Sequence, residues 1–243
     1  MLYRIYGLLI LILSLPITPA FGQTLTLNST ISPPLTNESK TGFLDVIAGE
    51  AFRRNNLHLK LIKLPAERGL RNANAGIEDG ELVRVVGMER IYKNLVPVPE
   101  KMMDMDFTAF SKNPSISIKN WQNLGPYSIG YIRGWKIYER NVPKGTKVIT
   151  ATNPEQLFTL LAKGRIDIAL YTRFMGLEII RHKQISHAKL LLPPLATKEM
   201  YMFLHKGHRK LVKGIGAALA NIKSEGIYQR EFEKLNAQFS GMN

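Results

Sequence analysis

Twice along this chain, a strand-like segment is followed by a helix-like segment and then by another strand-like segment. The first run has an alternating strand over Thr24 to Asn28, an apolar helical stripe over Phe43 to Arg54, and renewed alternation over Leu57 to Leu61. A strand, helix, strand order predicts two parallel strands joined by a crossover helix. The expected fold class is therefore α/β.

The rest of the first half extends this unit and then changes character. Pro65 suits the start of a helix that Gly76 ends, and Glu81 to Val86 reads as a third strand. From Tyr92 onward the pattern differs, with an extended, proline-broken segment at Asn94 to Pro99 and a strand-like stretch at Phe107 to Lys112. We expect the first α/β unit to stop there.

The second half repeats the strand and helix alternation. Its helix at Asn153 has a strong start, because Asn153 can cap, Pro154 fits the first turn and Gln156 can complete a capping box. The other expected elements are strands at Tyr127 to Ile132, Lys147 to Thr150, Ile166 to Leu170 and Lys189 to Leu192, and helices at Gly134 to Arg140 and Arg173 to His182.

A strand and two helices follow, at Tyr201 to His205, at Arg209 to Lys223, and after Gly226. If these helices return to the first unit, two segments must cross between the halves, near Phe107 to Lys112 and Pro194 to Met200. We expect one lobe to comprise residues 23–107 and 200–243, and the other to comprise residues 108–199.

The N-terminus has the tripartite pattern of a secretory signal peptide. Arg4 precedes the apolar stretch Leu8 to Leu15, and Ala20 to Gly22 forms a small-x-small cleavage signal. Prolines interrupt this run before the roughly 20 apolar residues that a membrane helix needs. We expect residues 1–22 to be cleaved before Gln23, which would place the mature protein in the periplasm.

Composition narrows the function classes. The chain has no cysteine, so disulfides, thiol nucleophiles and cysteine metal sites are excluded. Its formal charge of +14 favours an anionic partner, such as a small acid or a membrane surface, although a solvated basic surface is the alternative. Nucleic acid is disfavoured by the export signal and by the scattering of lysine and arginine along the chain.

An ordered set of short motifs resembles a known family, the bacterial extracellular solute-binding proteins of family 3. The motifs are Pro33-Pro34, Thr41-Gly42-Phe43, Gly76 to Gly80, Gly130 to Trp135, Leu160 to Asp167 and Tyr201 to Lys206. The resemblance implies a two-lobed type II periplasmic-binding fold that closes on a small molecule. In many members an ABC permease in the inner membrane then takes up the ligand. The sequence has no Gly-x-Ser-x-Gly elbow, phosphate loop or Gly-x-Gly-x-x-Gly motif, and we expect no enzyme activity, no cofactor and a monomer.

The family places an arginine after the Gly-x-x-Asp turn of the first lobe, where it holds a ligand carboxylate. Arg84 and Arg90 both fall near that position, and a guanidinium fork can grip a carboxylate with two hydrogen bonds. The alternative is that these arginines are paired with Glu81 or Glu89 and have no ligand role.

One position departs from the family pattern. Amino-acid binders carry an acid five residues after the aspartate of the second-lobe strand, where it pairs with the ligand ammonium; here that residue is Thr172. An ammonium in the cleft would lack its counter-charge, and an unpaired buried charge is costly. We therefore expect an anionic or polar metabolite rather than an ordinary amino acid.

Further candidate ligand residues follow from the same resemblance. Arg133, Gly134 and Trp135 correspond to the second-lobe anion site, with Trp135 either stacking on the ligand or packing in a core. Tyr171 and Thr172 lie at a strand end, with the same alternatives. Glu67 starts a helix near the first-lobe cleft, where it is either a ligand residue or half of a solvated pair with Arg68.

Two other functions stay open. An enzyme on the same fold, such as a dehydratase acting on a cyclic carboxylic acid, would need a cleft carboxylate such as Glu67, Glu81 or Glu89. A ligand-sensing module would bind without a permease. His205 and His208 have a metal-compatible spacing but no third ligand at helical spacing, which favours surface residues over a metal site.

Overall fold

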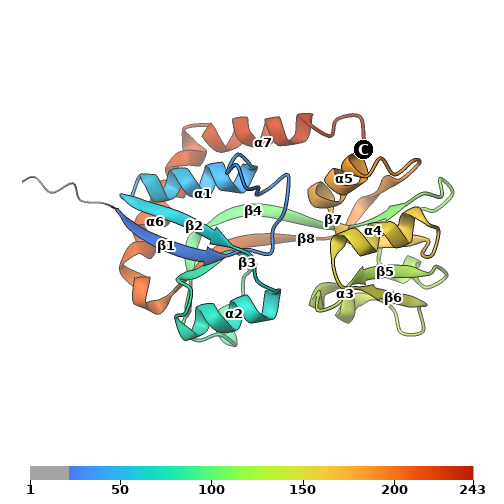
Figure 1. Ribbon diagram of the computed structural model, residues 1–243, viewed down its shortest axis with the longest axis horizontal. Coiled ribbons are helices and arrows are strands. Elements are labelled where there is room, and N and C mark those ends of the chain that lie inside the picture. Colours follow the sequence, from blue (N-terminus) through green and yellow to red (C-terminus); the bar gives the residue numbers. More distant parts are fainter. Residues whose placement is uncertain (1–21, 243) are drawn as a thin grey trace, which may run out of the picture.

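In the computed structural model, which describes residues 22–242, the chain forms two α/β lobes around one continuous ladder of strands (Figure 1). The eight strands of that ladder lie in the order β2-β1-β3-β8-β4-β7-β5-β6. The signal peptide expected at the N-terminus falls on residues 1–21, outside the described range, apart from Gly22.

The first lobe is built from the predicted strand and helix unit. Parallel strands β1 (Gln23–Asn28), β2 (Leu57–Ile62) and β3 (Gly80–Val85) lie side by side, with β1 in the middle. Helix α1 (Phe43–Arg53) covers one face and α2 (Ala66–Ala75) the other, as Figure 1 shows. The apolar stripe of α1 is buried in the main core, whereas α2 encloses a small cluster of Leu70, Ala73, Leu95 and Phe203.

The second lobe repeats the plan on a smaller scale. Its parallel strands are β5 (Ile129–Ile132), β6 (Val148–Ala151) and β7 (Ile168–Thr172), with β5 between the other two. Helices α3 (Lys136–Asn141), α4 (Pro154–Ala162) and α5 (Arg173–His182) accompany these strands. The expected helix at Gly134 to Arg140 thus begins two residues later.

Two long antiparallel strands join the lobes. β4 (Leu95–Ser111) and β8 (Lys189–His205) run from one lobe into the other (Figure 1). β8 pairs with β3 through Met200 to Leu204, and β4 pairs with β7 through Phe107 to Phe110. β4 and β8 also pair with each other from Leu95 opposite His205 to Ser111 opposite Lys189, so the prediction of two crossing segments is confirmed.

The short predicted segments at Asn94 to Pro99, Phe107 to Lys112, Lys189 to Leu192 and Tyr201 to His205 are the ends of these two strands. Proline cannot donate a ladder hydrogen bond, so it favours bulges and strand edges. The ladder accordingly shifts register after Pro97 in β4, and it also shifts between Phe107 and Ala109, opposite Pro193 and Pro194 of β8. The prolines therefore coincide with shifts in register, and both strands continue past them.

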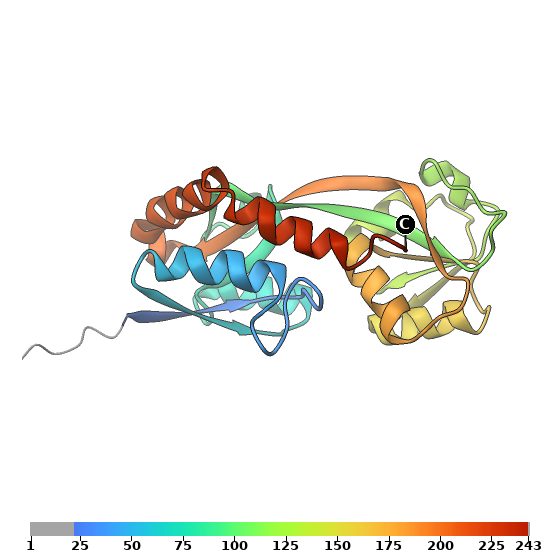
Figure 2. The ribbon, with the colours of Figure 1, turned by 90° about the horizontal axis from the view of Figure 1, so that it is seen from above.

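The C-terminal helices lie on the side of α1. Helix α6 (Arg209–Ser224) packs in the first lobe, and Gly226, at φ 71°, separates it from α7 (Ile227–Ala237). In Figures 1 and 2, α7 runs from the first lobe toward α5 of the second. Three 3-10 turns complete the structure, η1 (Met88–Arg90), η2 (Trp121–Leu124) and η3 (Lys206–His208). No helix of residues 22–242 is long and apolar enough to cross a membrane.

The junction of β3 with β8 tests how closely the first lobe is packed. A Cβ atom on Gly80 would lie 2.1 Å from the carbonyl oxygen of Phe203 and 3.0 Å from the Cα atom of Leu204, both in the β8 backbone. Because backbone cannot swing aside, we expect Gly80→Ala to lower the free energy of unfolding by about 1 to 3 kcal/mol. Urea unfolding measures this difference.

Gly49→Ala is the matched control, because a Cβ at this position in α1 would meet no atom within 4 Å. Alanine has the better helix propensity, so this variant should gain roughly 0.5 to 1 kcal/mol. Equal stability of the two variants would contradict the close β3 and β8 contact.

Candidate functional site

The site begins at the carboxyl ends of the parallel strands, where ligands of open α/β sheets bind. In the first lobe β1 ends at Asn28 and β3 at Val85; in the second lobe β5 ends at Ile132 and β7 at Thr172. The loops after these strands face one another across the crossing strands. A cleft between the lobes therefore has polar loop residues on both walls.

Two interactions already reach from one wall to the other. The backbone nitrogen and the hydroxyl of Ser32, in the loop after β1, lie 3.4 and 3.3 Å from the sulfur of Met175 in α5. The pKa of Lys136 in α3 is raised, chiefly by its hydrogen bond to Glu139 and more weakly by the charge of Glu67 in α2. Glu67 is exposed and lies on the first-lobe wall, opposite a second-lobe cation.

Arg84 is held by its own lobe. Its Nη2 atom lies 2.7 Å from the Glu81 carboxylate, its Nε donates to the same carboxylate at 2.8 Å, and Nη1 and Nη2 reach Thr30 and the Ala66 carbonyl at 3.3 Å. Glu81 is fully buried and also accepts two hydrogen bonds from the Asn28 amide, at 2.9 and 3.1 Å. The positive charge of Arg84 is therefore balanced by the buried Glu81 carboxylate of the same lobe.

Two opposing effects act on the pKa of the Glu81 carboxyl. Burial raises its pKa, while the Arg84 charge and the Asn28 hydrogen bonds oppose that rise. Gly69 of α2 makes room for the network, because a Cβ there would lie 1.8 Å from the Asn28 amide nitrogen. The glycine, the amide and the ion pair form one packed unit.

Arg90, the other first-lobe candidate, ends η1 and is exposed. No ion pair or side-chain hydrogen bond holds it within residues 22–242. The neighbouring Glu89 carboxylate accepts from the backbone N–H of Gly87 at 2.9 Å instead of pairing with Arg90. Of the two arginines, Arg84 has the carboxylate partner foreseen in the alternative interpretation, and Arg90 keeps its charge unpaired.

In the second lobe the loop Arg133 to Trp135 connects β5 to α3. Arg133 is exposed, and Gly134 adopts φ 88° and donates its N–H to the Glu139 carboxylate at 2.8 Å. That donor, expected to face a ligand anion, is thus taken by a side chain of the same lobe. Hydrogen bonding to Lys136 and Gly134 lowers the pKa of Glu139, so the carboxylate stays ionised.

Trp135 belongs to an aromatic cluster. Its ring stacks on that of Tyr138, with the two centroids 5.9 Å apart. The ring centroids of Tyr171 and Phe107 lie 4.9 and 6.3 Å from that of Trp135. Tyr171 is almost fully buried, and burial raises the pKa of its hydroxyl. Trp135 is only partly buried, so part of its side chain is open to solvent.

Thr172 takes the place of the acid expected in amino-acid binders. Its side chain is 2% exposed, and its hydroxyl has no hydrogen-bond partner among the residues that the structure describes. The next residue, Arg173, lies 3.9 Å from the Asp106 carboxylate in β4, with its guanidinium 5.2 Å from the ring of Phe174. The end of β7 thus carries a hydroxyl and a cation but no carboxylate.

A groove of about 550 Å³ opens beside these residues, between the end of β3 and α3. Val85, Val86 and Met88 line it from the first lobe, and Lys136, Ile137, Arg140 and Asn141 line it from the second. The crossing strands close it with Phe107 and residues 197–199. None of the residues selected from sequence lines this groove.

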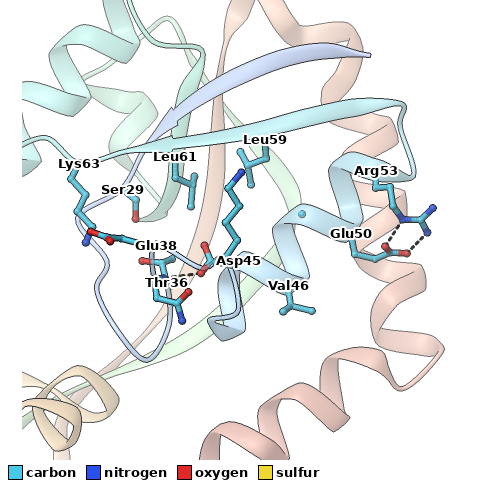
Figure 3. Close-up of a pocket in the computed structure, with 13 residues that line it drawn as sticks. Ser29, Thr36, Glu38, Asp45, Val46, Glu50, Arg53, Leu59, Leu61 and Lys63 are labelled. Atoms are coloured by element: carbon cyan, nitrogen blue, oxygen red, sulfur yellow. Dashed lines mark hydrogen bonds and ion pairs between the residues drawn. The ribbon is translucent and has the colours of Figure 1, made fainter. Parts of the chain in front are cut away.

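A second hollow of about 570 Å³ lies wholly in the first lobe, between α1, β2 and the loop after β1. Figure 3 shows Leu59 and Leu61 of β2 on one side and Val46 of α1 on the other. Its charges balance: the acids are Glu38, Asp45 and Glu50, and the bases are Lys40, Arg53 and Lys63. This hollow does not select for the sign of a ligand's charge.

The structure places the histidines and carboxylates that were weighed for metal binding or catalysis. His208 lies 2.6 Å from Asp79, His205 accepts from the Gly207 N–H, and no group of three His, Asp or Glu side chains in that range could hold a metal ion. Of the carboxylates weighed for an enzyme, Glu81 is buried and Glu89 is bound to backbone. Glu67 alone is free on the cleft wall.

Comparison with known proteins identifies the fold. No family model matches the sequence. An uncharacterized protein of Shewanella oneidensis strain MR-1 is 27% identical over 185 residues, which cover 72% of this chain and 69% of that protein.

Two solved structures superpose over most of the chain. A histidine kinase sensor domain with similarity to periplasmic binding proteins has a TM-score of 0.75 at 15% identity, over 88% of this chain and 96% of that one. The substrate-binding protein of an amino acid ABC transporter has a TM-score of 0.70 at 17% identity, over 87% and 98%. The two-lobed periplasmic-binding fold, and the resemblance in fold to family 3, are therefore confirmed.

Proposed function

We propose that this protein is an exported receptor that captures a small polar anion in the cleft between its lobes. Ligand contacts made by both walls would favour the closed arrangement over the open one, so capture and lobe closure are the same event. Binding without chemistry suits a cleft in which Glu67 is the one free candidate carboxylate. The periplasm is the proposed location, on the strength of the N-terminal sequence pattern.

The observation that carries this proposal is the charge of the two facing walls. Arg90 of the first lobe and Arg133 of the second are exposed and lack an ion-pair partner in the described part of the chain. Each therefore leaves a positive charge that attracts an anion. Each charge-assisted hydrogen bond contributes about 1.5 to 3 kcal/mol, against about 8 kcal/mol for micromolar binding.

The same walls disfavour an α-amino acid. Its carboxylate would find a cation, but its ammonium would meet Thr172 and Arg173 where amino-acid binders offer an acid. Glu67 is a carboxylate that could pair with an ammonium, but it lies on the opposite wall. Its negative charge already acts on Lys136, whose pKa it raises.

Isothermal titration against matched panels of organic acids and amino acids tests this proposal. We expect an organic acid to bind at micromolar concentration and the twenty common amino acids to bind at least about tenfold more weakly, which corresponds to ~1.4 kcal/mol. Native mass spectrometry of the protein as purified gives an independent view of a retained ligand. Micromolar binding of a common amino acid would contradict the proposal.

Two roles for ligand capture fit the fold, namely delivery of the ligand to a transporter and sensing of the ligand. The family resemblance favours delivery to an ABC permease, whereas the similarity to a histidine kinase sensor domain favours ligand sensing. A permease gene beside this gene would support delivery, and a kinase gene would support sensing. An organic acid that is consumed by the protein during incubation would instead indicate an enzyme.

A further inference from the structure

The groove between β3 and α3 differs from the rest of the cleft in having an apolar wall. Val86 follows β3 directly and is 59% exposed, although valine ordinarily lies inside. Met88 lines the same side, and Ile137 and Phe107 line the opposite side and the base. These side chains offer apolar contact to any ligand that extends out of the cleft centre along α3.

The groove is also cationic. Lys136, Arg140 and Lys198 line it together with one acid, Glu199. Glu199 is already engaged, since it accepts from the Tyr201 hydroxyl at 3.0 Å and from Lys101 at 3.3 Å. Lys136 is engaged likewise by Glu139 at 2.7 Å.

Arg140 and Lys198 are the two groove-lining cations that other described side chains do not engage. Both are exposed, and neither side chain has a hydrogen bond or an ion pair in the described range 22–242. One lies on α3 of the second lobe and the other on crossing strand β8, so they approach the groove from different elements. The first-lobe hollow, with its balanced acids and bases, lacks this excess of positive charge.

We propose that this groove is the specificity site for the captured anion and that the ligand is an amphipathic organic acid. Its carboxylate pairs with Arg140 and Lys198, and its aliphatic or aromatic body lies on Val86, Met88 and Ile137. This inference rests on the proposed function and adds to it the ligand class. Because the apolar walls belong to different lobes, an apolar body is fully covered only when the lobes close.

The test uses three probe acids on the full mature chain. Hexanoate and benzoate have an apolar body and one carboxylate, whereas succinate has two carboxylates and almost no apolar surface. We expect hexanoate or benzoate to bind at least about tenfold more tightly than succinate, since two further buried methylenes contribute ~1.6 kcal/mol. The double variant R140Q/K198Q should lose about tenfold or more in affinity for the favoured acid, as expected for a lost charge-assisted bond.

The double variant K210Q/K213Q is the control. It makes the same kind of change at two exposed lysines of α6, away from the groove, and should bind like the parent protein. Thermal unfolding of both variants confirms that they fold. Val86→Asn removes apolar surface without adding charge, and should weaken hexanoate more than succinate.

The outcomes separate the inference from the function on which it rests. If succinate binds tightly and R140Q/K198Q does not weaken it, the protein is an anion receptor but the groove is not its specificity site. If amino acids bind and none of the three acids does, both the groove inference and the anion receptor are wrong. Equal losses in the two double variants would also overturn the groove inference, because bulk charge would then explain the effect.

Discussion

Replacing Arg84 by methionine should lower the free energy of unfolding by about 3 to 5 kcal/mol at neutral pH, because removing one partner of a buried ion pair leaves the other charge uncompensated. Here the partner left behind is Glu81, which is fully buried, while the Arg84 side chain is 12% exposed. Among residues 22–242, Asn28 would then be the one side chain still bonded to that carboxylate, through its amide.

The cost should depend on pH in a defined direction. Burial already raises the pKa of Glu81 above its ordinary value of 4.5, and loss of the Arg84 charge should raise it further. A carboxyl with a raised folded-state pKa binds its proton more tightly when folded, so stability falls as pH rises through that pKa. Arg84→Met should therefore cost less at pH 5 than at pH 8.

Urea unfolding at the two pH values measures this dependence. Arg90→Met is the matched control, since Arg90 is exposed and unpaired and its loss should change stability by less than about 0.5 kcal/mol. Glu81→Gln in the Arg84→Met background should recover part of the loss and remove the pH dependence. If Arg84→Met is as stable as Arg90→Met, the ion pair is not part of the fold.

The sequence offered the Glu81 and Arg84 pair as one alternative, but strand alternation gave no reason to choose it. In a regular strand, residues three apart point to opposite faces, so alternation predicts no contact between these side chains. The pairing of β3 with β8 shifts register between Glu81 and Arg84, and such a bulge can re-aim a side chain. The bulge depends on the partner strand, which the local sequence does not contain.

Features set by local chemistry were predictable. Gly76 and Gly226 end and begin helices in left-handed conformations, and Asn153 caps α4 by accepting from the Gln156 N–H at 2.8 Å. The expected capping box differs in one detail, because the Gln156 side chain accepts from the Thr152 N–H rather than from Asn153. Local patterns therefore located the elements.

Features set by distant contacts were not predictable in the same way. The groove needs β3, α3 and β8 to meet, and these elements are far apart in sequence, so no spacing indicated Arg140 or Lys198. The Gly134 N–H looked free in the sequence, but Glu139 on the next helix occupies it. The lobe boundaries at residues 107 and 200 stay a prediction, and the C-terminal helix bears directly on them.

Helix α7 links the two lobes on the side away from α2, through a row of aromatic rings. The ring centroid of Phe232 lies 5.7 Å from that of Phe43 in α1 and 6.0 Å from that of Phe174 in α5. Phe239, just beyond the helix, lies 6.1 Å from Phe174, with the guanidinium of Arg181 5.8 Å from its ring. The end of a segment assigned to the first lobe is thus anchored on the second (Figure 2).

Phe239→Ala should break that anchor and lower the free energy of unfolding by about 3 to 5 kcal/mol, because Phe239 is 1% exposed and its loss leaves a cavity. The neighbouring Gln238→Ala, at an exposed position, is the control and should be nearly neutral. Urea unfolding separates the two variants, and equal stability would mean that the ring is not packed as described.

The same substitution should alter ligand capture without touching the cleft. Closure rotates one lobe against the other, so a contact that joins them behind the crossing strands biases the open and closed populations. If the anchor favours the arrangement in the structure, Phe239→Ala should change the radius of gyration measured by small-angle X-ray scattering and shift the affinity for whichever acid binds the parent protein. A variant that is less stable but has unchanged shape and affinity would limit α7 to a purely structural role.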